Sequence, residues 1–334
     1  MMDELITECP FIKSPFIADM INLFDSLRHK KKQFGVASCL LLTGESGSGK
    51  SELAKYYVKN NPVIEQDERT HVPVLHFELK SIATPKDLLR SLLIEIGDPQ
   101  QGEGARNQDD LLGRLVTLIN TVGIELLILD EIQVIIERRS QKVLTGIADL
   151  FKDLIKDTEI PIVFMGMPWS KYLVDSNQQL KRRIEYRHII PSYRISQRNL
   201  RDDYRKLLRL LSDGYQLSTQ FKCEGLPFTY RIFAATSGNL SNTAGLIRDA
   251  YIMSKMESKS VGVQLFSDVI RSYGVGDEDN PFLLELDQLD LKELIVHSDW
   301  RFGYRANKNA IIEGEYASYG ISLKGKIYSR TGTA

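Results

Sequence analysis

Apolar residues follow two different spacings along this chain, and the alternation between them predicts its architecture. Between residues 39 and 166, short continuous apolar runs alternate with segments in which apolar residues recur every three or four positions. The runs predict buried strands, and the segments predict amphipathic helices. The expected strands cover residues 39–43, 73–79, 123–131 and 160–166. The expected helices cover residues 52–58, 84–96, 111–122, 143–156 and 169–180. Strands that alternate with helices indicate an α/β fold with a parallel sheet covered on both faces.

The rest of the pattern divides the chain into four parts. Residues 1–34 are expected to form an N-terminal strap with one amphipathic helix at 16–27, and residues 35–195 the α/β core. From 196 to 275 the periodicity is helical, which predicts a small helical lid. The lid helices are expected at residues 199–211, 230–236, 243–256 and 263–273. Residues 276–334 begin acidic and become rich in glycine and tyrosine, so this tail would either dock a partner or pack on its own lid.

A short motif after the first expected strand carries specific chemistry. The sequence GESGSGKS fits the pattern G-x-x-x-x-G-K-[ST] at every position. Its residues are Gly44, Glu45, Ser46, Gly47, Ser48, Gly49, Lys50 and Ser51. Between a strand and a helix, such a loop wraps backbone N–H groups around a phosphate. Lys50 would then reach the β- and γ-phosphates, and Ser51 would ligate Mg²⁺. The motif therefore predicts a nucleoside triphosphate site, with ATP and Mg²⁺ as cofactors.

The third expected strand ends on two adjacent acids that complement this loop. Asp130 can hold Mg²⁺, and Glu131 can polarise a water for in-line attack on the γ-phosphate. The sequence separation between Lys50 and Asp130, 80 positions, leaves room for an additional strand between the two motif strands. A P-loop kinase for small molecules often lacks the second acid, so the pair favours an ATPase. The matched loop and acids predict a P-loop NTPase.

Hydrolysis also needs a positive group beside the transferred phosphoryl group to stabilise its negative charge, and ATPases of this kind commonly borrow an arginine from a neighbouring subunit. Arg182 and Arg183, after the fourth expected strand and its helix, are the candidates; a basic surface turn is the alternative. Gln133, Gln178 and Asn177 could each orient water or sense the γ-phosphate, and the sequence does not separate them.

Composition narrows the class of protein further. The chain of 334 residues is 43% hydrophobic and 26% charged, and no apolar run reaches the length of a membrane span. Acids at the N-terminus, where a signal peptide carries positive charge, lead us to expect a cytoplasmic protein without a membrane partner. The three cysteines and five histidines have no zinc-ligand spacing. The net charge is −1, yet residues 181–209 hold ten Lys or Arg against three acids. That basic stretch is either a solvated face or a partner surface, with nucleic acid as the first candidate.

Five segments together resemble a known family, the AAA+ regulators of Tn7-like transposition of the TniB/TnsC type. They are GESGSGKS at 44–51, ATPKDLLRSLLIEIGDP at 83–99, LLILDEIQ at 126–133, PIVFMGMP at 161–168 and QQLKRR at 178–183. The resemblance covers about residues 35–195, and 196–272 is similar to the helical lid of such ATPases. It implies an AAA+ fold and an ATP-bound ring or filament around double-stranded DNA. Such an assembly would link a target-selector protein, CRISPR-guided or protein-guided, to the transposase.

The resemblance also assigns residues. Lys50 and Ser51 match the Walker A pair, Asp130 and Glu131 match the Walker B pair, and either Arg182 or Arg183 falls where a trans-acting arginine is expected. The DNA contacts of the family fall on a segment that here offers Lys80, Ser81, Thr84, Lys86 and Arg90. Contacts of this sort position a protein on the backbone without selecting a sequence.

Two departures from the family pattern affect the expected activity. The fourth strand ends in Met165, Gly166 and Met167, where a polar γ-phosphate sensor is usual. Ser241 stands where many AAA+ relatives place a lid arginine. Both departures predict slow hydrolysis, stimulated by assembly or by partners, which suits a switch better than a motor.

Three other functions stay open at this point. A replication-type loader or initiator would share the core but usually carries a separate DNA-binding domain after the lid, and residues 276–334 offer none that we recognise. A P-loop kinase or metabolic NTPase would transfer phosphoryl to a small acceptor without a response to DNA. A scaffold that does not hydrolyse ATP would be unaffected by Glu131→Gln.

Overall fold

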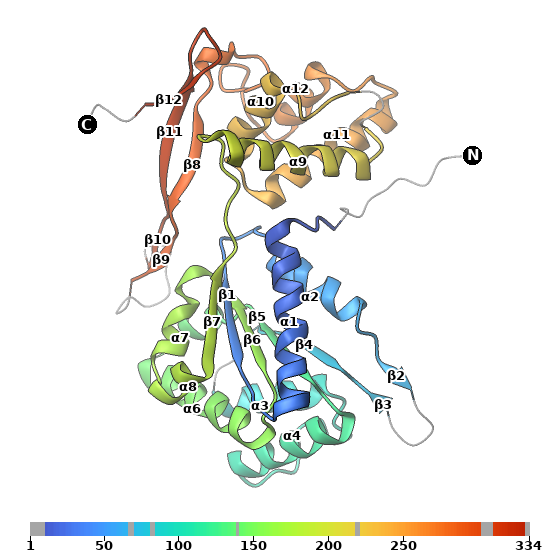
Figure 1. The fold of residues 1–334 in the computed structure, drawn as a ribbon, viewed down its shortest axis with the longest axis vertical. Coiled ribbons are helices and arrows are strands. Elements are labelled where there is room, and N and C mark those ends of the chain that lie inside the picture. Colours follow the sequence, from blue (N-terminus) through green and yellow to red (C-terminus); the bar gives the residue numbers. More distant parts are fainter. Residues whose placement is uncertain are drawn as a thin grey trace.

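The computed structural model describes residues 11–65, 70–80, 84–137, 140–217, 221–301 and 310–330. Figure 1 shows an α/β body and, above it, a second body of helices with an antiparallel sheet along one side. A single extended segment after β7 leads from the first body to the second. The predicted strap begins outside the described residues, because its first ten residues are not among them.

The α/β body is organised around a parallel sheet of five strands. Their order is β4 (Val74–Glu78), β5 (Leu126–Asp130), β6 (Ile162–Gly166), β1 (Cys39–Thr43) and β7 (Ile184–Ile189). Strands β1 and β5, which carry the two sequence motifs, are separated by β6. The additional strand predicted between the motif strands is therefore confirmed, and so is the α/β P-loop fold.

Alternate residues of each strand pack against helices on opposite faces of the sheet. On one face, Leu40 and Leu42 contact α1 (Pro15–Phe34) and α2 (Lys50–Lys59). On the other face, Leu41 belongs to the core formed with α3 (Pro85–Glu95), α4 (Gln108–Val122) and α6 (Gln141–Thr158). This two-sided burial explains why the strands are continuous apolar runs rather than alternating ones.

The helices begin where the sequence places caps. The Thr84 side chain accepts a hydrogen bond from the Asp87 N–H, and Pro85 follows at the first helical position of α3, as predicted. Asn107 caps α4 in the same way, and Gly123 ends it in the left-handed conformation. Most of the observed helices are longer than the predicted ranges, usually by a few residues at one end or at both ends.

One predicted helix is wrong, one strand of the parallel sheet was missed, and the antiparallel strands elsewhere in the chain were not predicted either. Instead of a single helix over 169–180, the chain forms a 3-10 turn (η1, Pro168–Ser170), α7 (Lys171–Asp175) and α8 (Gln178–Arg183). The break occurs because the Asn177 side chain accepts hydrogen bonds from the Gln179 and Leu180 N–H groups and starts a new helix. Strand β7 was not predicted because it is an edge strand, and the polar side chains of Glu185 and Arg187 interrupt its apolar pattern at exposed positions.

The upper body contains the predicted lid helices. These are α9 (Arg198–Gly214), α10 (Leu226–Thr236), α11 (Leu240–Glu257) and α12 (Val263–Ser272). After a 3-10 turn (η2, Leu286–Gln288), the tail adds an antiparallel sheet of β8 (Leu291–Val296), β11 (Glu315–Ile321) and β12 (Ile327–Ser329). Phe282, Leu291 and Ile321 from the tail are buried in the same apolar core as the lid helices. This part of the tail therefore packs on the lid.

A narrower part of the tail returns to the α/β body. Strand β9 (Asp299–Trp300) pairs with β10 (Ile311–Ile312), and both lie beside the α/β body in Figure 1. We call residues 297–301 and 310–312 the C-terminal arm. Its Trp300 and Ala310 are buried in the α/β core rather than in the lid core.

Two smaller observations complete the fold. A short hairpin of β2 (Ile64–Glu65) and β3 (Thr70–His71) projects beside β4, and α5 (Gln133–Glu137) follows the acidic end of β5. In the part of the chain that the structure describes, no helix combines the length and apolar character needed to cross a bilayer.

Candidate functional site

The loop between β1 and α2 has the backbone geometry of a phosphate cradle. Gly47 and Gly49 adopt φ values of 72° and 94°, which residues with a side chain rarely adopt. A Cβ at Gly47 would also lie 2.7 Å from the Ser241 Cβ of the lid. Gly49 precedes α2 without a side-chain cap, so the N–H groups of the first turn stay available for an anion.

Lys50 is buried beneath this loop and holds it together. Its ammonium donates to the Gly44 carbonyl oxygen at 2.8 Å and to the Glu45 carbonyl oxygen at 3.0 Å. Burial lowers the pKa of Lys50, and the nearby carboxylates of Asp130 and Glu131 offset part of that effect. A phosphate would offer the ammonium a charged partner in place of two neutral carbonyls.

Asp130 lies at the end of β5, fully buried beside Ser51. Its Oδ1 accepts the Glu131 N–H at 2.9 Å, whereas its Oδ2 has no hydrogen-bond partner among the described residues. Burial alone would raise the pKa of Asp130, but the adjacent His76 and Ser51 side chains and the Glu131 N–H hold it below its ordinary value. The Asp130 Oδ2 lies 3.7 Å from the His76 Nε2 and accepts no hydrogen bond among the described residues, and such a carboxylate oxygen next to a hydroxyl fits the oxygen ligands of Mg²⁺. The donor set therefore fits the predicted cation.

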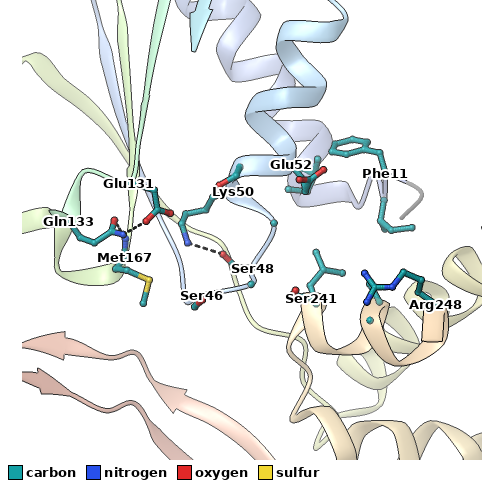
Figure 2. A pocket seen from close by; sticks show the side chains of 18 of the residues that line it. Phe11, Ser46, Ser48, Lys50, Glu52, Glu131, Gln133, Met167, Ser241 and Arg248 are labelled. Carbon is teal, nitrogen blue, oxygen red and sulfur yellow. Dashed lines mark hydrogen bonds between the residues drawn. The ribbon is translucent and has the colours of Figure 1, made fainter. Parts of the chain in front are cut away.

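Glu131 has an unusual backbone and a constrained side chain. Its φ of 61° is in the left-handed region, which is uncommon for a residue with a side chain and concentrates at functional sites. Its Oε2 accepts a hydrogen bond from the Gln133 Nε2, while the Gln133 Oε1 accepts from the Met167 N–H at 3.1 Å. Figure 2 shows Glu131 and Gln133 together on the wall of the pocket opposite the lid.

These groups line a cavity of about 590 Å³ between the α/β body and the lid. The core side contributes Lys50, Ser51 and Glu131, and the lid side contributes Ser241 and Arg248. The volume is in the range of ligand pockets. The lid also contacts the loop directly, since the Asn239 side chain donates to the Ser46 carbonyl oxygen at 2.8 Å and the Ser241 N–H donates to the Gly47 carbonyl oxygen at 3.0 Å.

Arg248 is a residue that the sequence analysis missed. It lies on α11, lines the cavity, and forms an ion pair of 2.9 Å with Asp249. The family pattern points only to position 241, where Ser241 stands in place of a lid arginine. Arg248 is seven positions further, close to two helical turns, so both side chains fall on one face of α11. That spacing is a signal that would have identified it.

Arg182 and Arg183 lie away from this cavity. Both are exposed in the last turn of α8, next to the start of β7, and so at the end of the sheet opposite the end that carries the phosphate loop. Within the described residues neither forms an ion pair, whereas their neighbours Lys181 and Arg187 both pair with Asp175. From this end of the sheet, the two predicted arginines cannot reach the cavity of their own chain.

The residues predicted to contact DNA lie around the start of α3. Lys80 and Thr84 are exposed, although the Thr84 hydroxyl is engaged with Asp87 as a helix cap. Lys86 is partly exposed, and Arg90 packs against Gly102 with its Nε buried. Ser81 falls outside the described residues. Lys80 and Lys86 are thus the most accessible cations of the predicted set.

The C-terminal arm holds the phosphate loop from outside. Both Glu45 carboxylate oxygens accept from Ser298, one of them from its N–H at 2.8 Å and the other from its hydroxyl. His297 Nδ1 lies 3.1 Å from the same carboxylate. Further along the arm, Trp300 packs on Trp169 with ring centroids 6.1 Å apart. The arm thus joins the tail to the nucleotide cavity, which its Ile311 also lines.

Comparison with known proteins identifies the family. The family model described as bacterial TniB protein matches residues 4–193. The chain belongs to the TniB family. No curated protein matches the chain.

Solved structures similar to this TniB-family chain share its AAA+ fold. Aeropyrum pernix ORC2, in ADPNP–ADP complexes, has a TM-score of 0.55 and 16% identity, over 81% of this chain and 70% of that one. Pyrobaculum aerophilum Cdc6p has a TM-score of 0.55 and 13% identity, over 82% and 71%. Aeropyrum pernix ORC1, solved in complex with DNA, has a TM-score of 0.53 and 15% identity, over 79% and 66%. At these identities the likeness shows the fold, which is that of an AAA+ P-loop NTPase.

Proposed function

We propose that this TniB-family chain is an ATPase that assembles on duplex DNA with ATP bound between neighbouring copies. In this role it links a target selector to the transposase in DNA transposition. The observation that carries the proposal is the division of the site. The C-terminal ends of the strands hold the phosphate loop and the acids, and their N-terminal ends present two arginines without an ion pair among the described residues.

The charged and polar residues at the phosphate loop and at the end of β5 each have a proposed part in hydrolysis. Lys50 and the N–H groups at the start of α2 would bind the phosphates, and Ser51 and Asp130 would hold Mg²⁺, which would supply charge neutralisation. Glu131 accepts the proton of the attacking water as the water oxygen bonds to the γ-phosphorus. The bond from that phosphorus to the bridging oxygen breaks, which leaves ADP and inorganic phosphate. Arg248 adds a cation from the lid side.

The arginine that completes the site comes from the next copy. An arginine supplied in trans raises turnover by roughly 10³ to 10⁵ in P-loop NTPases. Arg182 and Arg183 are exposed and form no ion pair among the described residues, and the nearby Asp175 already pairs with Lys181 and Arg187. Hydrolysis therefore requires assembly, and an isolated chain turns over slowly.

Complementation between two inactive variants tests this division. Lys50→Ala removes phosphate binding but keeps the arginines, and the double variant Arg182→Ala with Arg183→Ala does the reverse. Each alone should be inactive, and their mixture should recover part of the wild-type ATPase rate, because some interfaces then combine an intact cavity with intact arginines. Arg187→Ala is the matched control and should stay active, because Arg187 lies on the adjoining strand β7 but pairs with Asp175. A mixture as inactive as its components would refute sharing of the site.

Binding to DNA is tested in the same preparation. Lys80 and Lys86 at the start of α3 are the proposed phosphate contacts, and ORC1 of the same fold was solved with DNA. Assembly on duplex DNA with a non-hydrolysable ATP analogue should appear in electron micrographs and should weaken steeply with salt, because each phosphate contact releases counterions. Lys80→Ala with Lys86→Ala should weaken assembly, whereas Lys55→Ala, an exposed lysine paired with Glu52, should not. Single chains at every concentration would contradict the proposal.

A further inference from the structure

Gln133 joins the proposed catalytic acid to the end of the neighbouring strand. It is the first residue of α5, lines the cavity and has 5% of its surface exposed. Its carboxamide makes one hydrogen bond on each side, donating to the Glu131 carboxylate and accepting from the Met167 N–H. Figure 2 shows Gln133 between Glu131 and Met167 in the wall of the cavity.

The two bonds determine which way the amide points. A carboxylate can only accept and a backbone N–H can only donate, so a rotated amide would face an acceptor with its oxygen and a donor with its nitrogen. The amide nitrogen is therefore directed at Glu131. With Oε2 held by this bond, Oε1 is the carboxylate oxygen of Glu131 to which Gln133 does not donate.

The end of β6 is shaped to admit this side chain. Met165 and Met167 carry no strong hydrogen-bonding group, and Gly166 between them has no side chain at all. A Cβ at Gly166 would lie 2.5 Å from the Gln133 Oε1 and 2.3 Å from the Ser170 Oγ. A polar residue at this strand end would therefore collide with Gln133. The Gln133 side chain from α5 occupies the space that a side chain at position 166, at the end of β6, would need.

We propose that Gln133 is the positioning residue for Glu131, and that it takes over from α5 the part that a polar side chain at the end of β6 would play. The inference rests on the proposed ATPase activity. Gln133 does not itself take a proton; it holds one oxygen of Glu131 and fixes the carboxylate to the strand beside the phosphate loop. This bond also supports the left-handed backbone at Glu131.

The first test separates positioning from folding by kinetics. Gln133→Met keeps the length and volume of the side chain but removes both hydrogen bonds. We expect kcat to fall by about 10- to 100-fold, below the roughly 10²- to 10⁴-fold contribution of the general base itself. KM and the affinity for a non-hydrolysable ATP analogue should change less than about twofold. Gln108→Met, at an exposed glutamine on α4, is the matched control and should leave kcat unchanged.

The second test asks whether Gln133 acts through Glu131. In the Glu131→Gln background, Gln133→Met should lower the residual turnover no further, because the group that it orients is already gone. A general structural defect would lower the rate by the same factor in both backgrounds. An unchanged kcat in Gln133→Met, or equal factors in the two backgrounds, would overturn the inference.

The third test uses the nucleotide-free protein and measures no activity. The urea midpoints of wild type, Glu131→Ala, Gln133→Met and the double variant form a cycle. If the two side chains are bonded, the midpoint shift from Gln133→Met should be smaller in the Glu131→Ala background. Additive shifts would overturn the inference even if the wild type hydrolyses ATP. If the wild type hydrolyses no ATP under any condition, the proposed function fails and this inference fails with it.

Discussion

The C-terminal arm is held to the phosphate loop by hydrogen bonds to the charged carboxylate of Glu45. The variant Glu45→Gln tests how far docking of the arm depends on that charge. Two donors of Ser298, the N–H and the hydroxyl, are directed at the carboxylate. A hydrogen bond to a charged group contributes about 1.5–3 kcal/mol, against about 0.5–1.5 kcal/mol for a neutral pair. Glu45→Gln should therefore reduce the free energy of arm docking by about 2–3 kcal/mol, which corresponds to a roughly 30- to 150-fold increase in local opening.

Hydrogen exchange measures this opening directly. The Ser298 N–H bonds to Glu45, and the Arg301 N–H bonds to the Ala310 carbonyl oxygen across the arm, so both report docking. Their exchange should accelerate in Glu45→Gln, while amides of the β8–β11 sheet keep wild-type protection. Trp169 and Trp300 are the only two tryptophans of the chain and face each other across the same contact, so their emission should shift to the red as the arm opens.

A matched control shares the chemistry but not the contact. Glu52→Gln changes an exposed carboxylate in the first turn of α2, which pairs with Lys55 and not with the arm. It should leave the exchange of Ser298 and Arg301 unchanged. Wild-type exchange rates at these two amides in Glu45→Gln would refute the reasoning, because the arm would then be held without the carboxylate.

Two further predictions concern the lid and the acid stability of the core. Arg248→Gln should weaken ATP binding about 10-fold or more by calorimetry, since it removes a charged donor from the cavity, whereas Lys255→Gln on the same helix should not. Asp98 is buried and accepts from Arg114 and the Gly102 N–H; burial alone would raise its pKa, but these bonds hold it below the ordinary value of 3.8. Because the folded-state pKa is lowered, the ionised carboxylate stabilises the fold fully above about pH 3.8. That stabilisation is lost as the pH falls from 3.8 through the lower folded-state pKa. In urea titrations, Asp98→Asn should thus cost about 1–3 kcal/mol at pH 7, and the difference from wild type should shrink below pH 3.8; a constant difference would contradict the assignment.

The phosphate loop and the α/β order could be predicted because their signals are local. The motif from Gly44 to Ser51 is contiguous, and the strand ending at Asp130 is a continuous apolar run. Both depend only on neighbouring residues and on burial of both strand faces. The same locality explains the correct start of α3 at its Thr84 cap.

Features that depend on distant contacts could not be predicted in this way. Glu45 and Ser298 are 253 positions apart, and nothing near either residue marks the bond. Strand β7 has an exposed polar face because it lies at the edge of the sheet, which only the topology reveals. Gln133 was one of three polar side chains that the sequence left equivalent; it is distinguished by its bonds to Glu131 and Met167.

Release of phosphate from saturating Mg·ATP, by wild type and by Glu131→Gln with ATP binding measured in parallel, tests the central claim most directly. The account predicts that both proteins bind ATP with similar affinity, that wild type releases phosphate, and that Glu131→Gln releases it at least about 100-fold more slowly, as expected for loss of a general base. Equal rates of release from the two proteins would contradict it.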